Sequence, residues 1–258
     1  MSVGDNVAFG LRLRKLDRTT VRRRVADALT AVRLPGFEER WPDQLSRGQQ
    51  QRVALARVLA IKPDVLLLDE PLSNLDRSLR AELREMIREV QRSTGITTLF
   101  VTHDQAEAIA VADRMVLMLD GRLHQMGTAK SFFDAPADAK VARFFGNENF
   151  IPGVKEGARV RTAAGPLEVD NNEMPNGDVL LTIRPEAIEI GANGHNNLSA
   201  IVRASEYQGA SVRCTFAVGS DDLQVVHPPY QIFRKDKPVM LHLPRERLHV
   251  LPPERDAE

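Results

Sequence analysis

A short apolar run ends in two carboxylates and a proline in the stretch Val65-Leu66-Leu67-Leu68-Asp69-Glu70-Pro71. Such a run, following Lys62-Pro63-Asp64, is typical of a strand that is buried on both faces. Residues 97–101 show the same pattern and predict a second strand. Between the two, Asp76 can cap a helix that Gly95 ends. A strand, a helix and a strand in this order predict a parallel, right-handed unit.

Polar side chains follow each of the two predicted strands. Asp69-Glu70 comes after the first strand, and Thr102-His103-Asp104 comes after the second. The carboxyl ends of neighbouring parallel strands share one edge of the sheet, where open α/β sheets bind ligands. Adjacent carboxylates on an extended chain point to different sides, so that one can face a metal ion and the other a reacting water. The competing interpretation is a polar turn and a histidine that only begins a helix, and each residue taken singly favours it.

The start of another predicted helix lies upstream, at Leu45-Ser46-Arg47-Gly48-Gln49. A helix N-terminus offers unpaired N–H groups and the positive end of a dipole, so an anion can bind there, and Gly48 would let the backbone approach a phosphate. Ser46 with Gln49 three residues later is also a capping box, which stabilises a helix without any ligand. On these residues alone both interpretations stay open.

Length and composition limit the class of protein. The 258 residues carry 35 Lys+Arg against 35 Asp+Glu, so no overall basic field favours nucleic acid. No apolar stretch of about 18 residues is present to predict a membrane-spanning helix. The single cysteine, Cys214, cannot form an internal disulfide, which is compatible with a reducing compartment such as the cytosol.

The chain changes character near residues 146–153. From Ile151 onward, Pro, Gly and Asn recur between short alternating segments, which predicts a small all-β unit. We therefore divide the chain into residues 1–146 and 147–258. Within the first part, residues 115–119 and 123–126 around Asp120-Gly121 predict a hairpin appended to the sheet.

An amphipathic helix is predicted around residues 21–32, with Val21, Val25 and Leu29 on its apolar face. Three consecutive cations, Arg22, Arg23 and Arg24, flank that face. They form either a solvated surface or a phosphate patch, and the solvated surface is favoured because charges opposite an apolar face need no ligand.

The ordered combination of four segments resembles the ATP-binding cassette ATPases of ABC transporters. These segments are residues 45–52, residues 65–71, Leu72-Ser73-Asn74-Leu75-Asp76 and Val101-Thr102-His103-Asp104. The resemblance covers residues 1–146. The β-rich tail, with Arg184-Pro185-Glu186, is similar to the accessory oligobinding-type (TOBE) domain of import ATPases. The implied architecture is an α/β, partial nucleotide-binding domain, with a helical subdomain and a parallel-sheet core, followed by a small all-β domain.

The resemblance implies a role for each matching residue. Asp69 would hold Mg²⁺, Glu70 would activate the attacking water, and His103 would contact the γ-phosphate of ATP. The segment Ser46, Arg47, Gly48 and Gln49 would reach the ATP of a facing subunit, and Asp76 would lie at the same dimer seam. The implied partners are a second ATPase subunit, transmembrane permease subunits and, indirectly, a solute-binding protein, with no nucleic acid. The chain would sit on the cytoplasmic face of the membrane through the permease.

Two features depart from the family pattern. The phosphate-binding loop G-x-x-x-x-G-K-[ST] is absent, and no Gly-Lys dipeptide occurs in the sequence. Residues 1–7 resemble the segment after the family's glutamine loop, so we expect a chain that starts mid-domain, binds ATP poorly alone and is inactive alone. We also expect an open sheet edge beside residues 65–68 and reduced stability. Arg47 stands where the family most often has glycine, either as a phosphate contact or extended into solvent.

Three functional classes remain to be compared. The first is the ATPase subunit of an importer for polyamine, ferric iron or an oxyanion. The second is an ATPase-dead dimerisation partner or regulatory module that lends only its 46–49 loop. The third is a nucleic-acid protein built on the same cassette. The intact Glu70 and His103 favour the first over the second, and the β-rich tail and balanced charge favour transport over the third.

Overall fold

The computed structural model of the protein describes residues 1–73, 75–170 and 174–254. Asn74, which is part of the quoted segment 72–76, lies outside the described residues. The chain divides into two compact units, Met1–Asp113 and Arg114–Glu258. The first unit mixes helices with a parallel pair of strands and the second is mainly β, which confirms the predicted fold class.

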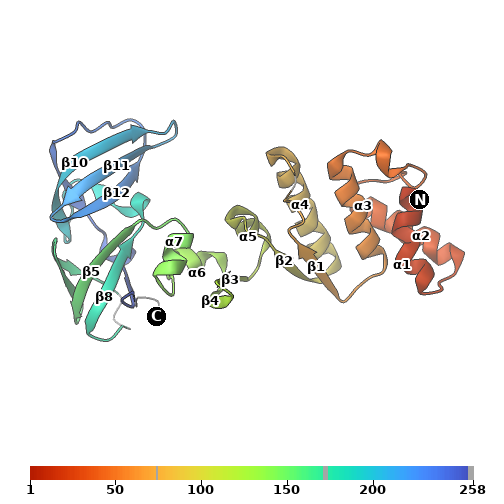
Figure 1. Cartoon of the computed structure of the whole chain (residues 1–258), viewed down its shortest axis with the longest axis horizontal. Coiled ribbons are helices and arrows are strands. Elements are labelled where there is room, and N and C mark those ends of the chain that lie inside the picture. The colour runs from red at the N-terminus through yellow and green to blue at the C-terminus, as the bar shows by residue number, and fades with distance from the viewer. Residues whose placement is uncertain (74, 171–173, 255–258) are drawn as a thin grey trace. The chain divides into compact units, whose positions relative to one another are not determined.

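The first unit places a group of helices next to a small parallel sheet (Figure 1). Its elements are α1 Val3–Leu13, α2 Arg18–Ala31, the 3₁₀ turn η1 Pro42–Gln44, α3 Arg47–Ala60, β1 Val65–Asp69, α4 Arg77–Thr94, β2 Thr97–Val101 and α5 Gln105–Val111.

Side-chain caps set the starts of these helices. The oxygen of each N-cap side chain accepts a backbone N–H of the first turn, which satisfies a donor that the helix cannot pair. The caps of α1 to α5 are Ser2, Asp17, Ser46, Asp76 and Asp104. At the other end of α4, Gly95 adopts φ 66°, the left-handed conformation that ends many helices. The sequence-based assignment of α4, from its Asp76 cap to Gly95, is confirmed.

Strands β1 and β2 pair in parallel, from Val65 opposite Thr97 to Asp69 opposite Val101. One face of this sheet is covered, because Leu66 is 1% exposed and belongs to the same core cluster as the buried side chains of α4. On the other face, Leu67 is 69% exposed and Leu99 is 58% exposed. The prediction of strands buried on both faces is therefore wrong for this chain, because the described residues cover only one face.

The second unit begins with a hairpin, β3 Met115–Leu119 and β4 Arg122–Gly127, followed by the short helices α6 Ala129–Asp134 and α7 Ala139–Phe144. Asp120 and Gly121 both have positive φ, 51° and 72°, as a tight hairpin turn requires. The predicted hairpin is confirmed. Its predicted attachment to the first sheet is not, because in the described residues β3 and β4 pair only with each other.

The remainder of the second unit consists of two five-stranded sheets, ordered β12-β11-β10-β13-β9 and β14-β8-β5-β6-β7. Asn149, 1% exposed, links them: its Nδ2 donates to the carbonyls of Ile183 at 3.1 Å and Gln224 at 2.8 Å, and its Oδ1 accepts from the Gln224 N–H. The strands are β5 Asn149–Glu156, β6 Arg159–Thr162, β7 Gly165–Glu168, β8 Gly177–Ile183, β9 Glu189–Ile190, β10 Asn197–Tyr207, β11 Val212–Val218, β12 Asp221–His227, β13 Pro238–His242 and β14 His249–Leu251, with 3₁₀ turns η2 Pro185–Ala187 and η3 Arg245–Arg247.

The boundary between residues 146 and 147 stays a prediction. The all-β portion begins with β5 at Asn149, close to that boundary, whereas the second compact unit begins earlier, at Arg114. Among the described helices, none combines the length and the apolar character that crossing a bilayer requires.

Candidate functional site

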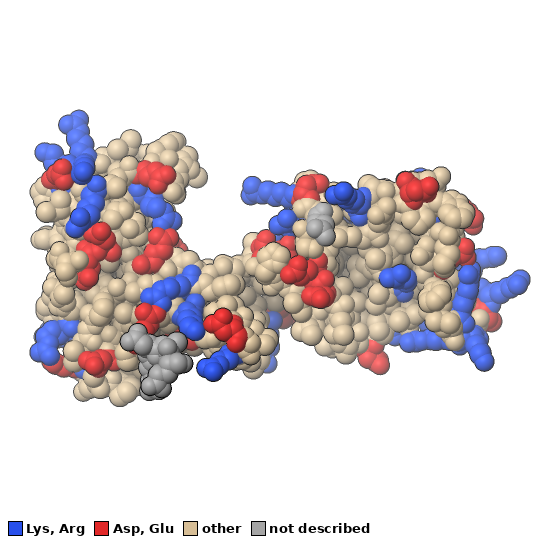
Figure 2. All heavy atoms as spheres, viewed as in Figure 1, with Lys and Arg blue, Asp and Glu red and all other residues tan. Residues whose placement is uncertain are grey.

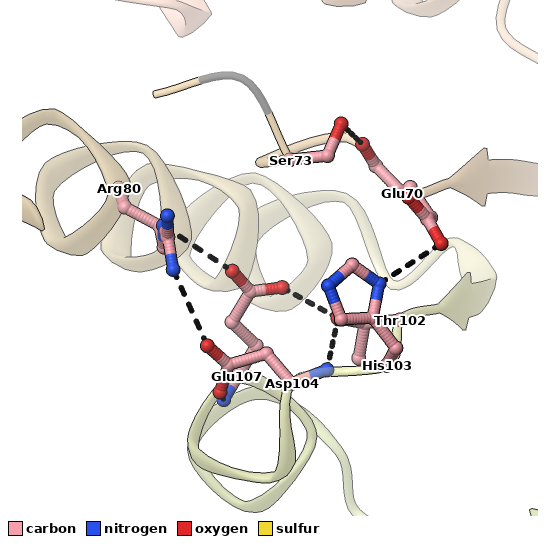
Figure 3. A pocket seen from close by; sticks show the side chains of 7 residues that line it. All are labelled: Glu70, Ser73, Arg80, Thr102, His103, Asp104 and Glu107. Atoms are coloured by element: carbon pink, nitrogen blue, oxygen red, sulfur yellow. Dashed lines mark hydrogen bonds and ion pairs between the residues drawn. The ribbon is translucent and has the colours of Figure 1, made fainter. Parts of the chain in front are cut away.

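A small pocket lies where β1 and β2 end and α4 and α5 begin (Figure 3). Its walls are polar, and they come from segments that the sheet brings to one edge. The lining residues are Glu70, Ser73, Arg80, Thr102, His103, Asp104 and Glu107. The edge is the one at which open α/β sheets bind ligands.

Glu70 follows β1 directly and turns the chain out of the sheet. Its N–H donates to the carbonyl of Val101 at 2.9 Å, and its own carbonyl accepts from both the N–H and the hydroxyl of Ser73. Its φ of 44° lies in the left-handed region, which costs a residue other than glycine about 1–3 kcal/mol. The surrounding turn therefore fixes a strained backbone at the residue whose carboxylate faces His103 (Figure 3).

The imidazole of His103 contacts that carboxylate. Nδ1 of His103 lies 3.0 Å from Oε1 of Glu70, and both side chains are exposed, 75% and 47%. The hydrogen bond to Glu70, followed by the charge of Glu70, raises the pKa of His103 above its ordinary value of 6.5. The arrangement holds a carboxylate, which can accept a proton, next to a protonated ring, which can donate one, at the sheet edge.

Arg80 ties three segments together beside this pair. Its Nη1 lies 3.3 Å from Oδ2 of Asp104, its Nη2 donates to the carbonyl of Leu75 at 3.1 Å, and its Nε lies 3.7 Å from Oε1 of Glu107. The side chain of Glu107 is 5% exposed and also accepts a 2.7 Å hydrogen bond from the hydroxyl of Thr102. The buried carboxylate of Glu107 thus has a guanidinium beside it and accepts a hydrogen bond from a hydroxyl, as burial of a charge requires.

No role for Arg80 or Glu107 is predicted from the sequence. A signal for Glu107 was present, since it lies three residues after Asp104 at the start of a predicted helix and so shares a face with it. No comparable spacing pointed to Arg80, because its carboxylate partners are more than twenty residues away along the chain.

The N-terminus of α3 carries the other predicted binding residues. Ser46 and Gln49 form the complete capping box: the Ser46 hydroxyl accepts from the Gln49 N–H, and the Gln49 side chain accepts from the Ser46 N–H. Gly48 is buried, and a Cβ added to it would lie 3.3 Å from Cδ2 of Leu79, so its small size lets α3 pack against α4. Arg47 is exposed and lines a groove with Leu75.

The two remaining predicted residues differ in their contacts. Oδ1 of Asp76 accepts from the N–H of Leu79 and from the hydroxyl and N–H of Ser78, and these hydrogen bonds, that from Leu79 first, lower the pKa of Asp76. Asp69 is exposed, and within the described part of the chain its carboxylate has no hydrogen-bond or ion-pair partner. The structure thus brings Glu70 and His103 into contact, uses Ser46, Gln49 and Asp76 as helix caps, and leaves Asp69 free outside the pocket lining.

Comparison with known proteins identifies the class. The family model of the ABC transporter matches residues 1–73, and that of the TOBE domain matches residues 181–251. The chain belongs to the ABC transporter family, in the group of importer ATP-binding subunits.

Three relatives illustrate the group. The chain is 40% identical to a Fe(3+) ions import ATP-binding protein of Mannheimia succiniciproducens, over 94% of this chain and 70% of the relative. A Vibrio cholerae protein of the same name is 44% identical over 83% of this chain and 62% of its own length. A sulfate/thiosulfate import ATP-binding protein of Mesorhizobium japonicum is 40% identical over 90% of this chain and 70% of its own. The chain therefore spans between 62% and 70% of these relatives.

Proposed function

We propose that this protein is the ATP-hydrolysing subunit of an importer, acting through the pocket at the ends of β1 and β2. The observation that carries the proposal is the contact between His103 and Glu70, 3.0 Å apart at the carboxyl ends of two parallel strands. Glu70 is the general base in this proposal, drawing a proton from the attacking water. A positioned general base contributes about 10²–10⁴-fold in rate.

His103 has two tasks in the proposed reaction. Its ring orients the Glu70 carboxylate through Nδ1. Its other ring nitrogen is left to donate a hydrogen bond to charge that develops on a transferred phosphoryl group. The raised pKa of His103 favours the protonated ring that this donation requires.

Asp69 is the proposed residue for Mg²⁺. Within the described residues, no three His, Cys, Asp and Glu side chains gather as a metal site. That fits an ion which takes only one or two protein carboxylates and completes its coordination with phosphate oxygens and water. The carboxylate of Asp69, which is exposed and has no partner among the described residues, suits this role. The ion would neutralise phosphate charge during transfer.

The α3 N-terminus supplies the proposed trans contacts. Ser46, Arg47, Gly48 and Gln49, together with Asp76, would face the ATP held by a second ATPase subunit in a dimer. The exposed surface of Ser46 and Arg47 is compatible with such a contact. Permease subunits and, through them, a solute-binding protein would complete the importer on the cytoplasmic side of the membrane.

Tight ATP binding needs backbone and lysine contacts that this sequence does not contain. Because it holds no Gly-Lys dipeptide and so no G-x-x-x-x-G-K-[ST] loop, we propose that the 258-residue chain alone binds ATP weakly and does not turn it over. Activity would then require a cassette that supplies the phosphate loop.

Ferric iron is the proposed solute. Several relatives at 40–44% identity are named for Fe(3+) import, and one at 40% is named for sulfate/thiosulfate import. An oxyanion is thus the competing choice.

The test is phosphate release from Mg-ATP in two arms. In the first arm the chain is alone, and no release above that of the Glu70→Gln variant is expected. In the second arm the phosphate-loop segment of an intact relative is fused ahead of Met1, and phosphate release is expected that falls with Glu70→Gln. Steady release by the fused Glu70→Gln variant would refute Glu70 as the base. A gain that depends on the 46–49 loop but not on Glu70 would favour the regulatory partner instead.

A further inference from the structure

Cations are concentrated at the junction of α1 and α2. Residues 12–24 hold seven Lys and Arg against the single carboxylate of Asp17, although the whole chain has no net charge. Figure 2 shows Lys and Arg side chains gathered over the end of the first unit that α1 and α2 form. The seven cations are Arg12, Arg14, Lys15, Arg18, Arg22, Arg23 and Arg24.

Internal contacts neutralise little of this charge. Arg12 forms an ion pair with Asp5, and Nη1 of Arg14 donates to the carbonyl of Ile61. In the part of the chain that the structure describes, Arg18 and Arg22 are exposed and form no ion pair. The carboxylate of Asp17 is occupied as the N-cap of α2. The surface therefore presents cations that the fold does not use.

Exposed apolar side chains on α1 lie close in sequence to these cations. Phe9 is 54% exposed and Leu13 is 70% exposed, and they lie four residues apart on one face of α1. Arg14 and Lys15 follow Leu13 directly, and Arg18 and Arg22 lie one turn apart on α2. We call these exposed side chains at the junction of the two helices, Phe9, Leu13, Lys15, Arg18 and Arg22, the α1–α2 strip.

We propose that the α1–α2 strip binds the anionic phospholipid headgroups of a membrane surface. Cations at a membrane surface gain about 1 kcal/mol each from anionic lipid, and Phe and Leu beside them can enter the boundary between headgroups and acyl chains. Exposed Phe and Leu among arginines fit that boundary better than a nucleic-acid backbone, which needs cations but offers no apolar phase. The contact is made by this chain itself and does not depend on nucleotide or permease.

The test is flotation of the 258-residue chain, without nucleotide, with vesicles of phosphatidylcholine alone or mixed with phosphatidylglycerol. Binding to the mixed vesicles only is expected. Replacing both cations in Arg18→Ala/Arg22→Ala should weaken this binding by about fivefold per cation. Arg234→Ala/Lys235→Ala, an equal change of charge at exposed positions of the second unit, should leave it unchanged. Leu13→Ser should weaken it while leaving its dependence on salt concentration unaltered.

Circular dichroism confirms that each variant is folded before the comparison. The proposal is overturned if neutral vesicles bind equally well, or if the control pair matches the Arg18/Arg22 pair. It is also overturned if inorganic pyrophosphate releases the chain completely, which would indicate a site for free phosphate. Tighter binding to duplex DNA than to vesicles, with no effect of Leu13→Ser, would assign the strip to nucleic acid instead.

Discussion

His103 and Glu70 are 33 residues apart in the sequence, yet Nδ1 of the ring lies 3.0 Å from Oε1 of the carboxylate. The parallel register of β1 and β2 produces this contact, because it places Asp69 opposite Val101 and so aligns the residues that follow each strand. Both side chains are exposed, so the contact is accessible to direct measurement.

The first prediction concerns the titration of His103. Its pKa should lie above the ordinary value of 6.5, and Glu70→Gln should lower it, because the amide keeps a hydrogen-bond acceptor but removes the charge. NMR titration of the histidine ring protons measures both values. An unchanged pKa in the variant would show that the pair does not form in solution.

The raised pKa of His103 also predicts how the stability of the fold changes with pH. A group whose pKa is higher in the folded state stabilises the fold below its unfolded pKa, and the contribution disappears as pH rises through the folded value. Unfolding by urea at pH values on either side of 6.5 should therefore show a small loss of stability with rising pH. Glu70→Gln should diminish that loss.

The second prediction concerns Arg80. Arg80→Ala should lower the free energy of unfolding by about 1–3 kcal/mol, because it leaves the buried carboxylate of Glu107 without its cation. Arg84→Ala is the matched control on the same helix, since Arg84 forms no ion pair in the described residues, and its effect should be much smaller. Urea denaturation compares the two, and equal losses would contradict the role given to Arg80.

The third prediction separates the capping role of Ser46 from a phosphate contact. Ser46→Ala should cost about 1 kcal/mol of stability through loss of the cap, whereas Ser46→Asp should preserve stability because Asp is an equally good N-cap. If the α3 N-terminus faces phosphate in a dimer, Ser46→Asp should still reduce hydrolysis by an intact partner cassette, because it places a carboxylate against the phosphates. Unimpaired hydrolysis with Ser46→Asp would leave the capping box as the whole role of Ser46.

The fourth prediction concerns the two sheets of the second unit. Asn149→Ala removes three hydrogen bonds from a buried position and leaves the backbone groups of Gln224 unpaired, so it should cost roughly 2–4 kcal/mol. Asn197→Ala is the control, because the side chain of Asn197 is exposed and, among the described residues, hydrogen-bonds only to the backbone of Asn193 and Gly194. The shift in thermal midpoint measures both, and a similar small shift for each would show that Asn149 does not link the sheets.

Much of the fold could be predicted from local chemistry. The Asp76 cap, the Gly95 ending, the Ser46–Gln49 box and the Asp120-Gly121 turn depend on residues near one another in sequence, and each is present. The exposure of Leu67 and Leu99 could not be predicted, because an apolar run does not say how many faces of its sheet the rest of the chain will cover.

Only part of the site could be predicted from the sequence, because local patterns do not specify how distant elements pack together. Glu70 and His103 follow apolar runs, and parallel pairing of two such runs is enough to bring them together. The cluster of Arg80 with Asp104 and Glu107 depends on how α4 and α5 pack, which is a tertiary property without a local sequence signal. For Gly48 the sequence leaves a close approach to phosphate open, and the packing of α3 against Leu79, which an added Cβ would meet at 3.3 Å, has no local sequence signal.

At Glu70 the backbone conformation that favours stability and the side chain that the proposed chemistry needs call for different residues. With φ at 44°, this position would suit glycine or asparagine better than glutamate. Glu70→Gly or Glu70→Asn should therefore give a more stable chain that has lost its proposed proton acceptor. A screen that selects for thermostability alone would therefore tend to remove the proposed activity. Keeping glutamate at this position lowers the free energy of unfolding.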